Sequence, residues 1–284
     1  MVPGRYMDKI AIISDVHGNL EALNVVLNDI KSRNINKIIC LGDIAGKGLH
    51  QEECINLIRK NCFVTIKGNN DDFYSNTWDL SEFEEIDRKR YNFFKSKLSN
   101  ESIEFLKNLP FSYEFYLSGR LVRLFHAHPE KNYKSIGNID TIDRLYELFL
   151  PSKNTKSDKK ADIIIYGHIH TPYMQKIYNR FIINAGSVGN SIDVFRNPYK
   201  DGNVKNTTTA NYVILSGIID SHDINDDFNF EFVNLNYDID KELINNNDNI
   251  ESELYEQELK NGKYRDLNKI NNCLKIRGID KNKK

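Results

Sequence analysis

An apolar stretch near the start of the chain, followed at once by an acid and a histidine, constrains the fold most. Residues 9–13 are a run of β-formers, and Asp15 and His17 come directly after them. This pattern is typical of a buried strand that delivers polar side chains to the carboxyl edge of an α/β sheet, where such sheets bind ligands. Asp15 and His17 are two residues apart, so both project from one side of an extended chain and can share a metal ion. By itself, one such pair is weak evidence for a metal site.

The alternation of elements that follows predicts an α/β fold. Apolar residues recur at helical spacing from 20 to about 33, and 37–41 is a second buried strand. A helix is expected around 52–59 and a third strand at 62–66. Strand, helix, strand, helix and strand in this order predict a parallel sheet with right-handed crossovers.

The remaining pattern predicts one domain with two additions. Residues 7–240 form the domain, and 73–110 have a helical pattern and are expected to be an insertion within it. Strands are expected on both sides of a turn at Ser118-Gly119. Residues 241–284 are expected to form a helical C-terminal extension that ends in a mobile tail rich in Asn and Lys.

Composition limits the classes of partner. The chain has 39 Lys plus Arg and 40 Asp plus Glu, so its near-neutral charge gives no support for nucleic-acid or membrane binding. It contains no apolar stretch of membrane-spanning length and no charged-then-apolar leader. The four cysteines show no CxxC spacing, which favours a cytoplasmic protein with reduced thiols. The expected partner is a small molecule, and the sequence leaves the oligomeric state open.

Polar residues follow several predicted strands and together predict a metal centre. The candidate ligands are Asp15, His17, Asp43, Asn69, His126, His168 and His170. A lone histidine after a strand is more often a hydrogen-bonding residue than a ligand, but chance does not readily give several such strand ends that converge. Seven ligands exceed what one ion takes while keeping an open position. We therefore expect two divalent ions about 3.5–4 Å apart, bridged by a carboxylate. Mixed imidazole, carboxylate and amide ligands favour manganese, with iron or zinc as alternatives.

These motifs resemble a known family. The matching segments are Ser14–Asn19, Gly42-Asp43, Gly68–Asp71, His126-Ala127 and Gly167–His170. In this order they resemble the signature of the calcineurin-like metallophosphoesterases, and the resemblance covers roughly residues 8–240. Asn184–Gly189 resembles a loop of the small bacterial phosphodiesterase branch. His126–Asn132 and Tyr237-Asp238 are similar, more loosely, to bacterial diadenosine polyphosphate hydrolases.

The resemblance implies a four-layer α/β/β/α sandwich and a division of the ligands. The first metal would be held by Asp15, His17 and His170. The second would be held by Asn69, His126 and His168. Asp43 would bridge both ions.

The chain departs from the family pattern where many members carry a histidine after the motif asparagine, because it has Asn70 there. The proton for the leaving group must then come from water or from another residue such as His128, or the leaving group must need none. We expect Asp43, Asn69 and His128 to take part in catalysis, and Asn70 and Ser187 to contact the substrate. The alternative to substrate contact for Ser187 is that its side chain stabilises a turn. Arg123 is a candidate phosphate clamp, with a solvated surface arginine as its alternative.

The predicted function is hydrolysis of a phosphoester or phosphoanhydride by a two-metal enzyme. Nucleotides such as diadenosine polyphosphates are the first substrate candidates. Cyclic nucleotides or other phosphodiesters come next, and phosphoproteins third. The alternative is a binding protein and not an enzyme: a module that a metal stabilises and that does not catalyse. The full ligand set favours the enzyme.

Overall fold

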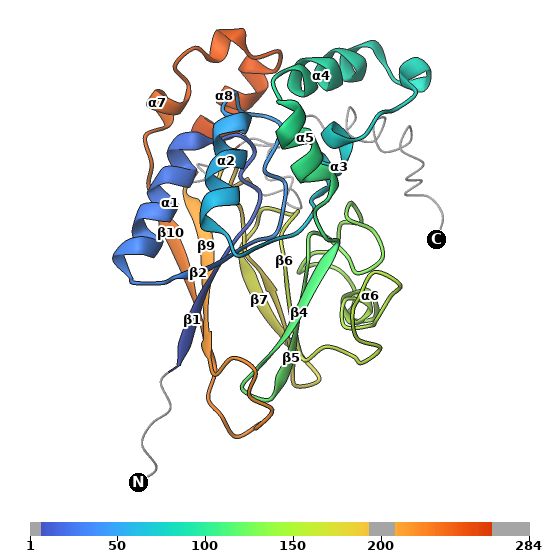
Figure 1. Cartoon of the computed structure of the whole chain (residues 1–284), viewed down its shortest axis with the longest axis vertical. Coiled ribbons are helices and arrows are strands. Elements are labelled where there is room, and N and C mark those ends of the chain that lie inside the picture. The colour runs from blue at the N-terminus through green and yellow to red at the C-terminus, as the bar shows by residue number, and fades with distance from the viewer. Residues whose placement is uncertain (1–6, 193–207, 263–284) are drawn as a thin grey trace.

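Two five-stranded β-sheets lie face to face in the computed structural model, which describes residues 7–192 and 208–262 (Figure 1). The first sheet has the order β10 (Asn229–Leu235), β9 (Ala210–Gly217), β1 (Asp8–Ile13), β2 (Lys37–Cys40), β3 (Val64–Thr65). The second has the order β4 (Ser112–Leu117), β5 (Arg120–Phe125), β6 (Ile163–Tyr166), β8 (Arg180–Asn184), β7 (Tyr173–Ile177). The predicted parallel pairing holds for β1, β2 and β3, whereas β9 and β10 are antiparallel. Both sheets are therefore mixed.

The alternation of side chains along β1 explains the layers. Ile10 and Ile12 belong to a buried cluster between the two sheets, whereas Ala11 and Ile13 belong to a cluster under the helices. Successive strand residues point to opposite faces, and both faces are covered, so the strand is apolar throughout. A third cluster packs the outer face of the second sheet against α6 (Ile142–Glu147). The predicted α/β/β/α sandwich is confirmed.

Helices α1 (Leu20–Ser32) and α2 (Gln51–Asn61) cover the first sheet. Asn19 caps α1, because its side chain accepts a hydrogen bond from the Ala22 amide. The buried positions of α1 form one apolar stripe: Ala22, Leu23, Val26 and Ile30. Since α1 begins just after His17, this packing also fixes the loop that carries the first candidate ligands.

The segment predicted to be an insertion is helical. It contains the end of α3 (Asn69–Ser75), a 3₁₀ helix (Leu80–Glu82), α4 (Glu85–Ser96) and α5 (Asn100–Lys107). Phe73 in α3 contacts Trp78, Phe83 and Tyr91, so these aromatic rings pack on one another. Tyr91 and Phe94 belong to the same core cluster as α1, which joins the segment to the main core.

The C-terminal extension lies against the start of α1. It contains α7 (Ile239–Glu242), a 3₁₀ helix (Asn246–Asp248) and α8 (Ser252–Asn261), and Figure 1 places α7 and α8 beside the upper ends of α1 and α2. Glu242 accepts hydrogen bonds from the Glu21 amide and the Tyr255 hydroxyl. The predicted mobile tail lies outside the described residues from 263 onward.

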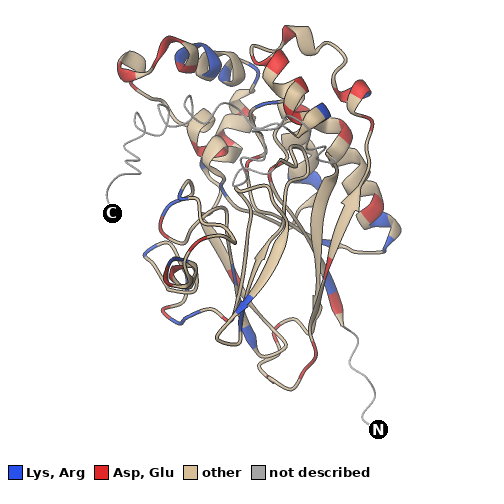
Figure 2. Ribbon diagram, turned by 180° about the vertical axis from the view of Figure 1, so that it is seen from behind, with Lys and Arg blue, Asp and Glu red and all other residues tan. Residues whose placement is uncertain are grey.

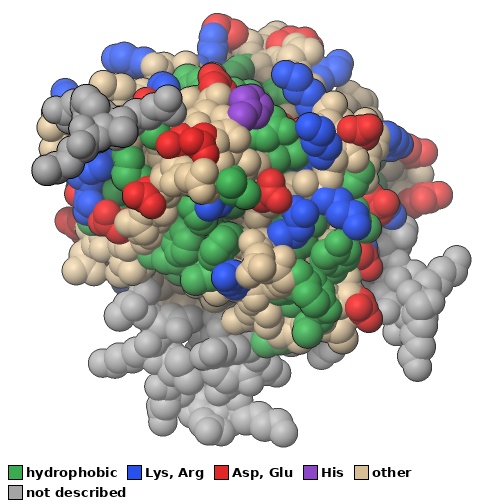
Figure 3. Space-filling model, turned by 90° about the horizontal axis from the view of Figure 1, so that it is seen from below, with side chains coloured by type: hydrophobic (Ala, Val, Ile, Leu, Met, Phe, Trp, Pro, Cys, Tyr) green, Lys and Arg blue, Asp and Glu red, His purple; other side chains and the backbone are tan. Residues whose placement is uncertain are grey.

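Charged groups of both signs are interspersed on the surface. Figure 2 shows Lys and Arg beside Asp and Glu on the helices above the first sheet. Figure 3 shows the end of the molecule near the start of β1, where both signs lie among hydrophobic side chains. Across residues 7–192 and 208–262, no helix has the length and apolar character needed to cross a bilayer.

Candidate metal centre

The seven candidate ligands come from five strand ends. Asp15 and His17 follow β1, and Asp43 follows β2. His126 follows β5 in the second sheet, and His168 and His170 follow β6. Asn69 is the first residue of α3, shortly after β3. The two sheets meet at these carboxyl ends. One contact between them is the hydrogen bond from the His126 ring to the Leu41 carbonyl, just beyond β2.

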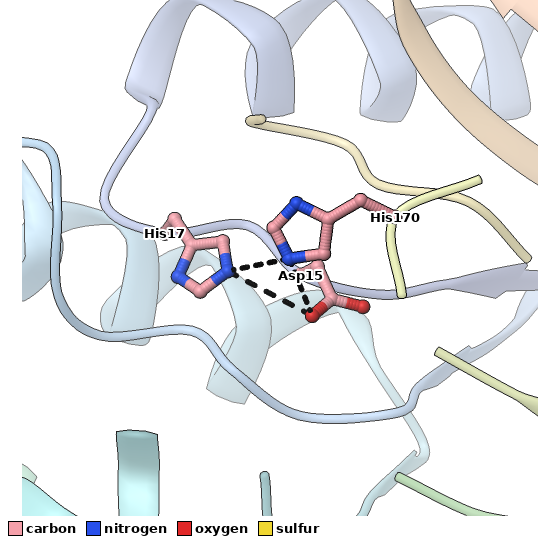
Figure 4. Close-up of side chains that lie close together, drawn as sticks. All are labelled: Asp15, His17 and His170. Atoms are coloured by element: carbon pink, nitrogen blue, oxygen red, sulfur yellow. Dashed lines mark hydrogen bonds and ion pairs between the residues drawn. The ribbon is translucent and has the colours of Figure 1, made fainter. Parts of the chain in front are cut away.

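Asp15, His17 and His170 form one tight group (Figure 4). The Nε2 atoms of His17 and His170 lie 3.1 Å apart. Asp15 Oδ1 lies 3.2 Å from His170 Nε2 and 3.7 Å from His17 Nε2. All three side chains are almost completely buried. Three potential ligand atoms therefore face one small volume from two different sheets.

A second group adjoins the first through Asp43. Its Oδ2 atom lies 3.5 Å from His126 Nε2 and 3.8 Å from His17 Nε2, so it contacts both groups. Asn69 Oδ1 lies 3.1 Å from His126 Nε2. The ring of His168 lies edge-on to that of His126, and its Nε2 is 2.9 Å from the Ser135 hydroxyl oxygen. The structure thus brings the seven residues close together, and both Asp43 and Asp15 reach histidines of both groups.

The hydrogen bonds around these residues fit cation binding. Nδ1 of His126 donates to the Leu41 carbonyl at 2.8 Å, and Nδ1 of His170 donates to the Asn190 carbonyl at 2.5 Å. Each bond turns Nε2 toward the cluster, as in imidazole ligands of metals. Asp15 Oδ1 is buried without a hydrogen-bond partner among the described residues, which is costly for a carboxylate unless a cation satisfies it.

The electrostatics of the carboxylates favour a cation. Burial alone would raise the pKa of Asp15, but the positive charge of His170 and His126 holds it well below its usual range. His126 does the same for the pKa of Asp43. Both groups are therefore carboxylates at neutral pH, packed within a few ångströms of each other.

The histidines differ in protonation. Burial, together with the charges of neighbouring histidines, lowers the pKa of His17 to about 3 and that of His168 to about 4, so both are neutral. For His126, burial opposes protonation, but Asp43 and Asp15 raise its pKa to about 9. A cation that binds at His126 Nε2 must therefore displace a proton.

Comparison with known proteins identifies the family. A family model described as the calcineurin-like phosphoesterase superfamily domain matches residues 8–199. The chain belongs to this superfamily. An uncharacterised protein of Methanocaldococcus jannaschii is 35% identical over 199 residues, which span 65% of this chain and 77% of that protein. The predicted resemblance is confirmed at the level of the superfamily.

Two solved structures share the superfamily fold. A metallophosphoesterase from Sphaerobacter thermophilus has 22% identity and a TM-score of 0.64, with 90% of this chain and 99% of that chain covered. A hypothetical protein from Pyrococcus horikoshii has 16% identity and a TM-score of 0.66, with the same coverage of 90% and 99%. At these identities the likeness establishes the fold alone.

The calcineurin-like centre of this chain is built on strained backbone. Five of the candidate ligands have positive φ, between 51° and 67°: Asp15, His17, Asp43, His168 and His170. Side chains other than Gly rarely adopt this region, and such strain persists where the surroundings hold it in place. Close packing around two glycines helps to keep the backbone in this conformation. A Cβ atom on Gly68 would lie 2.1 Å from Asp43 Oδ1, and one on Gly167 would lie 2.4 Å from Asp15 Oδ2.

Asp71 holds the loop after β2, a role that sequence reasoning missed. Its Oδ2 accepts the amide N–H of Asp43 at 2.7 Å and of Gly68 at 3.0 Å. Its Oδ1 accepts the amides of Ile44 and Ala45 at 2.9 and 3.2 Å. Burial and the neighbouring Asp43 raise the pKa of Asp71 to about 6. Its place in the Gly68–Asp71 motif was the signal that could have found it.

Asn70 contacts Asp43 from the start of α3. Its backbone amide donates to Asp43 Oδ1 at 2.7 Å, and its side-chain amide donates to Oδ2 at 2.5 Å. Asn70 is half-buried. It lies beside the candidate ligand Asp43, and its contact with a substrate stays a prediction.

His128 and Ser187 are held by other groups. Nδ1 of His128 accepts the Glu130 amide, and its Nε2 lies 3.5 Å from Glu147 Oε2. The Ser187 hydroxyl donates to the Asp15 carbonyl at 2.7 Å and accepts the Asn190 amide at 2.8 Å. These bonds support the turn-stabilising alternative for Ser187, because its proton is already donated within the loop.

Arg123 fits neither of its predicted roles. It is completely buried and forms an ion pair with Glu114, with 2.6 Å between Nε and Oε1. Its guanidinium also donates to three carbonyls, those of Phe149, Ser157 and Lys159. Arg123 therefore joins the loop before β6 to the second sheet and is not a surface arginine.

Proposed function

We propose that this chain is a two-metal hydrolase of phosphoesters or phosphoanhydrides, with nucleotides such as diadenosine polyphosphates as the first substrate candidates. The observation that carries the proposal is the buried cluster of Asp15, His17, Asp43, His126 and His170, which form two candidate cation groups. Asn69 and His168 lie beside His126 at its edge. Membership of the phosphoesterase superfamily supports the reaction class. We further propose a cytoplasmic location, because the buried free cysteines Cys40 and Cys54 fit a compartment that keeps thiols reduced.

We assign the ligands to two sites. Asp15, His17 and His170 would hold one divalent ion, Asn69, His126 and His168 the other, and Asp43 would contact both. When bound, a pair of manganese ions, or of iron or zinc ions, lowers the pKa of water and neutralises charge on a phosphoryl group. The neutral state of His17 and His168 at pH 7 keeps their lone pairs free for this role.

The surroundings of His128 favour one kind of substrate. Burial and the nearby Lys134 lower the pKa of His128 to about 4, so it is neutral at pH 7 and poorly suited to donate a proton. Asn70, which stands where many family members have histidine, cannot donate one as an imidazolium does. A leaving group that departs without protonation avoids this difficulty, and a nucleoside phosphate expelled from an anhydride is such a group.

The test combines metal content with a substrate panel. Metal-free protein is loaded with manganese and its metal content is measured, with two ions per chain expected. The loaded protein is then assayed on a diadenosine polyphosphate, a cyclic nucleotide, a nitrophenyl phosphoester and a phosphopeptide. One ion or none in folded protein would contradict the two-metal assignment. Two ions without hydrolysis of any substrate would favour the metal-stabilised binding module.

A further inference from the structure

A buried carboxylate from the C-terminal extension lies beside the candidate metal centre. Glu258 in α8 is only 1% exposed, and its Oε2 accepts hydrogen bonds from Lys47 Nζ at 2.9 Å and Asn190 Nδ2 at 3.0 Å. A carboxylate is buried at high cost unless it is paired and hydrogen-bonded. The two partners of Glu258 come from the loop after β2 and the loop after β8, which are the loops around the centre.

Asn190 connects this carboxylate to the proposed ligands. Its carbonyl accepts Nδ1 of His170 at 2.5 Å, and its amide donates to Ser187, whose hydroxyl donates to the Asp15 carbonyl. Its side-chain oxygen accepts from Lys47 Nζ at 2.8 Å. The backbone and the side chain of Asn190 are thus both fixed, and its carbonyl sets which nitrogen of His170 carries the proton.

We infer that Glu258 is a positioning residue for His170 and that α8 is part of the metal centre. This inference rests on the proposed function, because it requires His170 to bind a metal. Glu258 holds the side chain of Asn190, whose carbonyl orients the His170 ring. It also forms an ion pair with Lys47, which lies in the loop after β2. Asn249, just before α8, donates to the Lys47 carbonyl at 2.6 Å and fixes the same loop.

The experiment titrates metal-free full-length protein with manganese by calorimetry. The variants are Glu258→Ala, Glu258→Gln and the matched control Glu256→Ala, which removes a carboxylate from the exposed face of the same helix. Loss of a hydrogen-bond partner behind a ligand typically weakens metal binding by roughly 10–100-fold. Glu258 acts on His170 only through Asn190, so for Glu258→Ala we expect a loss at the lower end of that range, about 10-fold, in one of two binding steps. Glu258→Gln should lose less, since glutamine keeps an oxygen for Asn190. Glu256→Ala should match the wild type.

The outcomes separate this inference from the proposed function. Two unaltered binding steps in both Glu258 variants would overturn the inference and leave the two-metal proposal in place. Equal weakening of both steps would also overturn it, because that result indicates a general structural role. If Glu258→Ala does not fold, Glu258→Gln decides alone. A wild type that binds no manganese would overturn the proposed function and this inference with it.

Discussion

Replacing Asp71 with asparagine should destabilise the protein and weaken both proposed metal sites. Each Asp71 oxygen accepts two backbone N–H groups, which belong to Asp43, Gly68, Ile44 and Ala45. In Asp71→Asn one oxygen becomes an NH₂ group that faces two N–H donors. Two buried donors then lose their acceptor, at about 1–3 kcal/mol each, so the free energy of unfolding should fall by roughly 2–6 kcal/mol.

The assay is urea unfolding of metal-free protein followed by circular dichroism, with manganese calorimetry on the same samples. The control is Asp72→Asn, one residue along α3, whose side chain is 37% exposed. A surface change of this kind normally stays within about 0.5 kcal/mol of the wild type. Because Asp71 fixes the amides of Asp43 and Gly68, both binding steps should weaken. If Asp71→Asn unfolds within about 0.5 kcal/mol of the wild type, the reasoning is refuted.

Three further predictions concern the centre and the C-terminal extension. Asp43→Asn should lower turnover by at least about two orders of magnitude, the scale for losing one major transition-state stabiliser, and near-normal turnover in folded protein would remove Asp43 from the bridge. On leaving groups, the wild type should cleave an anhydride at least about 10-fold faster than an alkyl phosphoester, and His128→Ala should leave that ratio unchanged, because His128 is neutral at pH 7. Equal rates in the wild type would contradict the leaving-group argument, and a wider ratio in the variant would identify His128 as the proton donor. Burial raises the pKa of Glu242 to about 7 from 4.5, so the folded state keeps a proton that the unfolded state has lost. The free energy of unfolding should therefore fall by on the order of 3 kcal/mol as pH rises from about 4.5 to about 7. Thermal unfolding of Glu242→Gln should lack this part of the pH dependence.

The part of the candidate site that could be predicted from the sequence is the set of polar residues at the strand ends. Each ligand follows a short apolar run, and the end of a buried strand fixes where the next side chains lie. The pattern alone therefore places Asp15, Asp43 and His126 at the carboxyl ends of strands. Their shared volume in the structure agrees with that placement, and their roles as ligands stay a prediction for the metal titration.

The sequence by itself determined the order of strands and helices, the face that each buries and the residues at the strand ends. These follow from hydrophobic period and from motifs within a few residues. Only the tertiary structure decided the roles of Asp71, Arg123, Ser187 and Glu258. Asp71, Ser187 and Glu258 bond to groups 28, 172 and 211 residues away, and Arg123 pairs with Glu114 across a strand pair. Hydrogen bonding and charge pairing depend on which groups the packed sheets and helices bring within about 3 Å, and no local pattern specifies that distance.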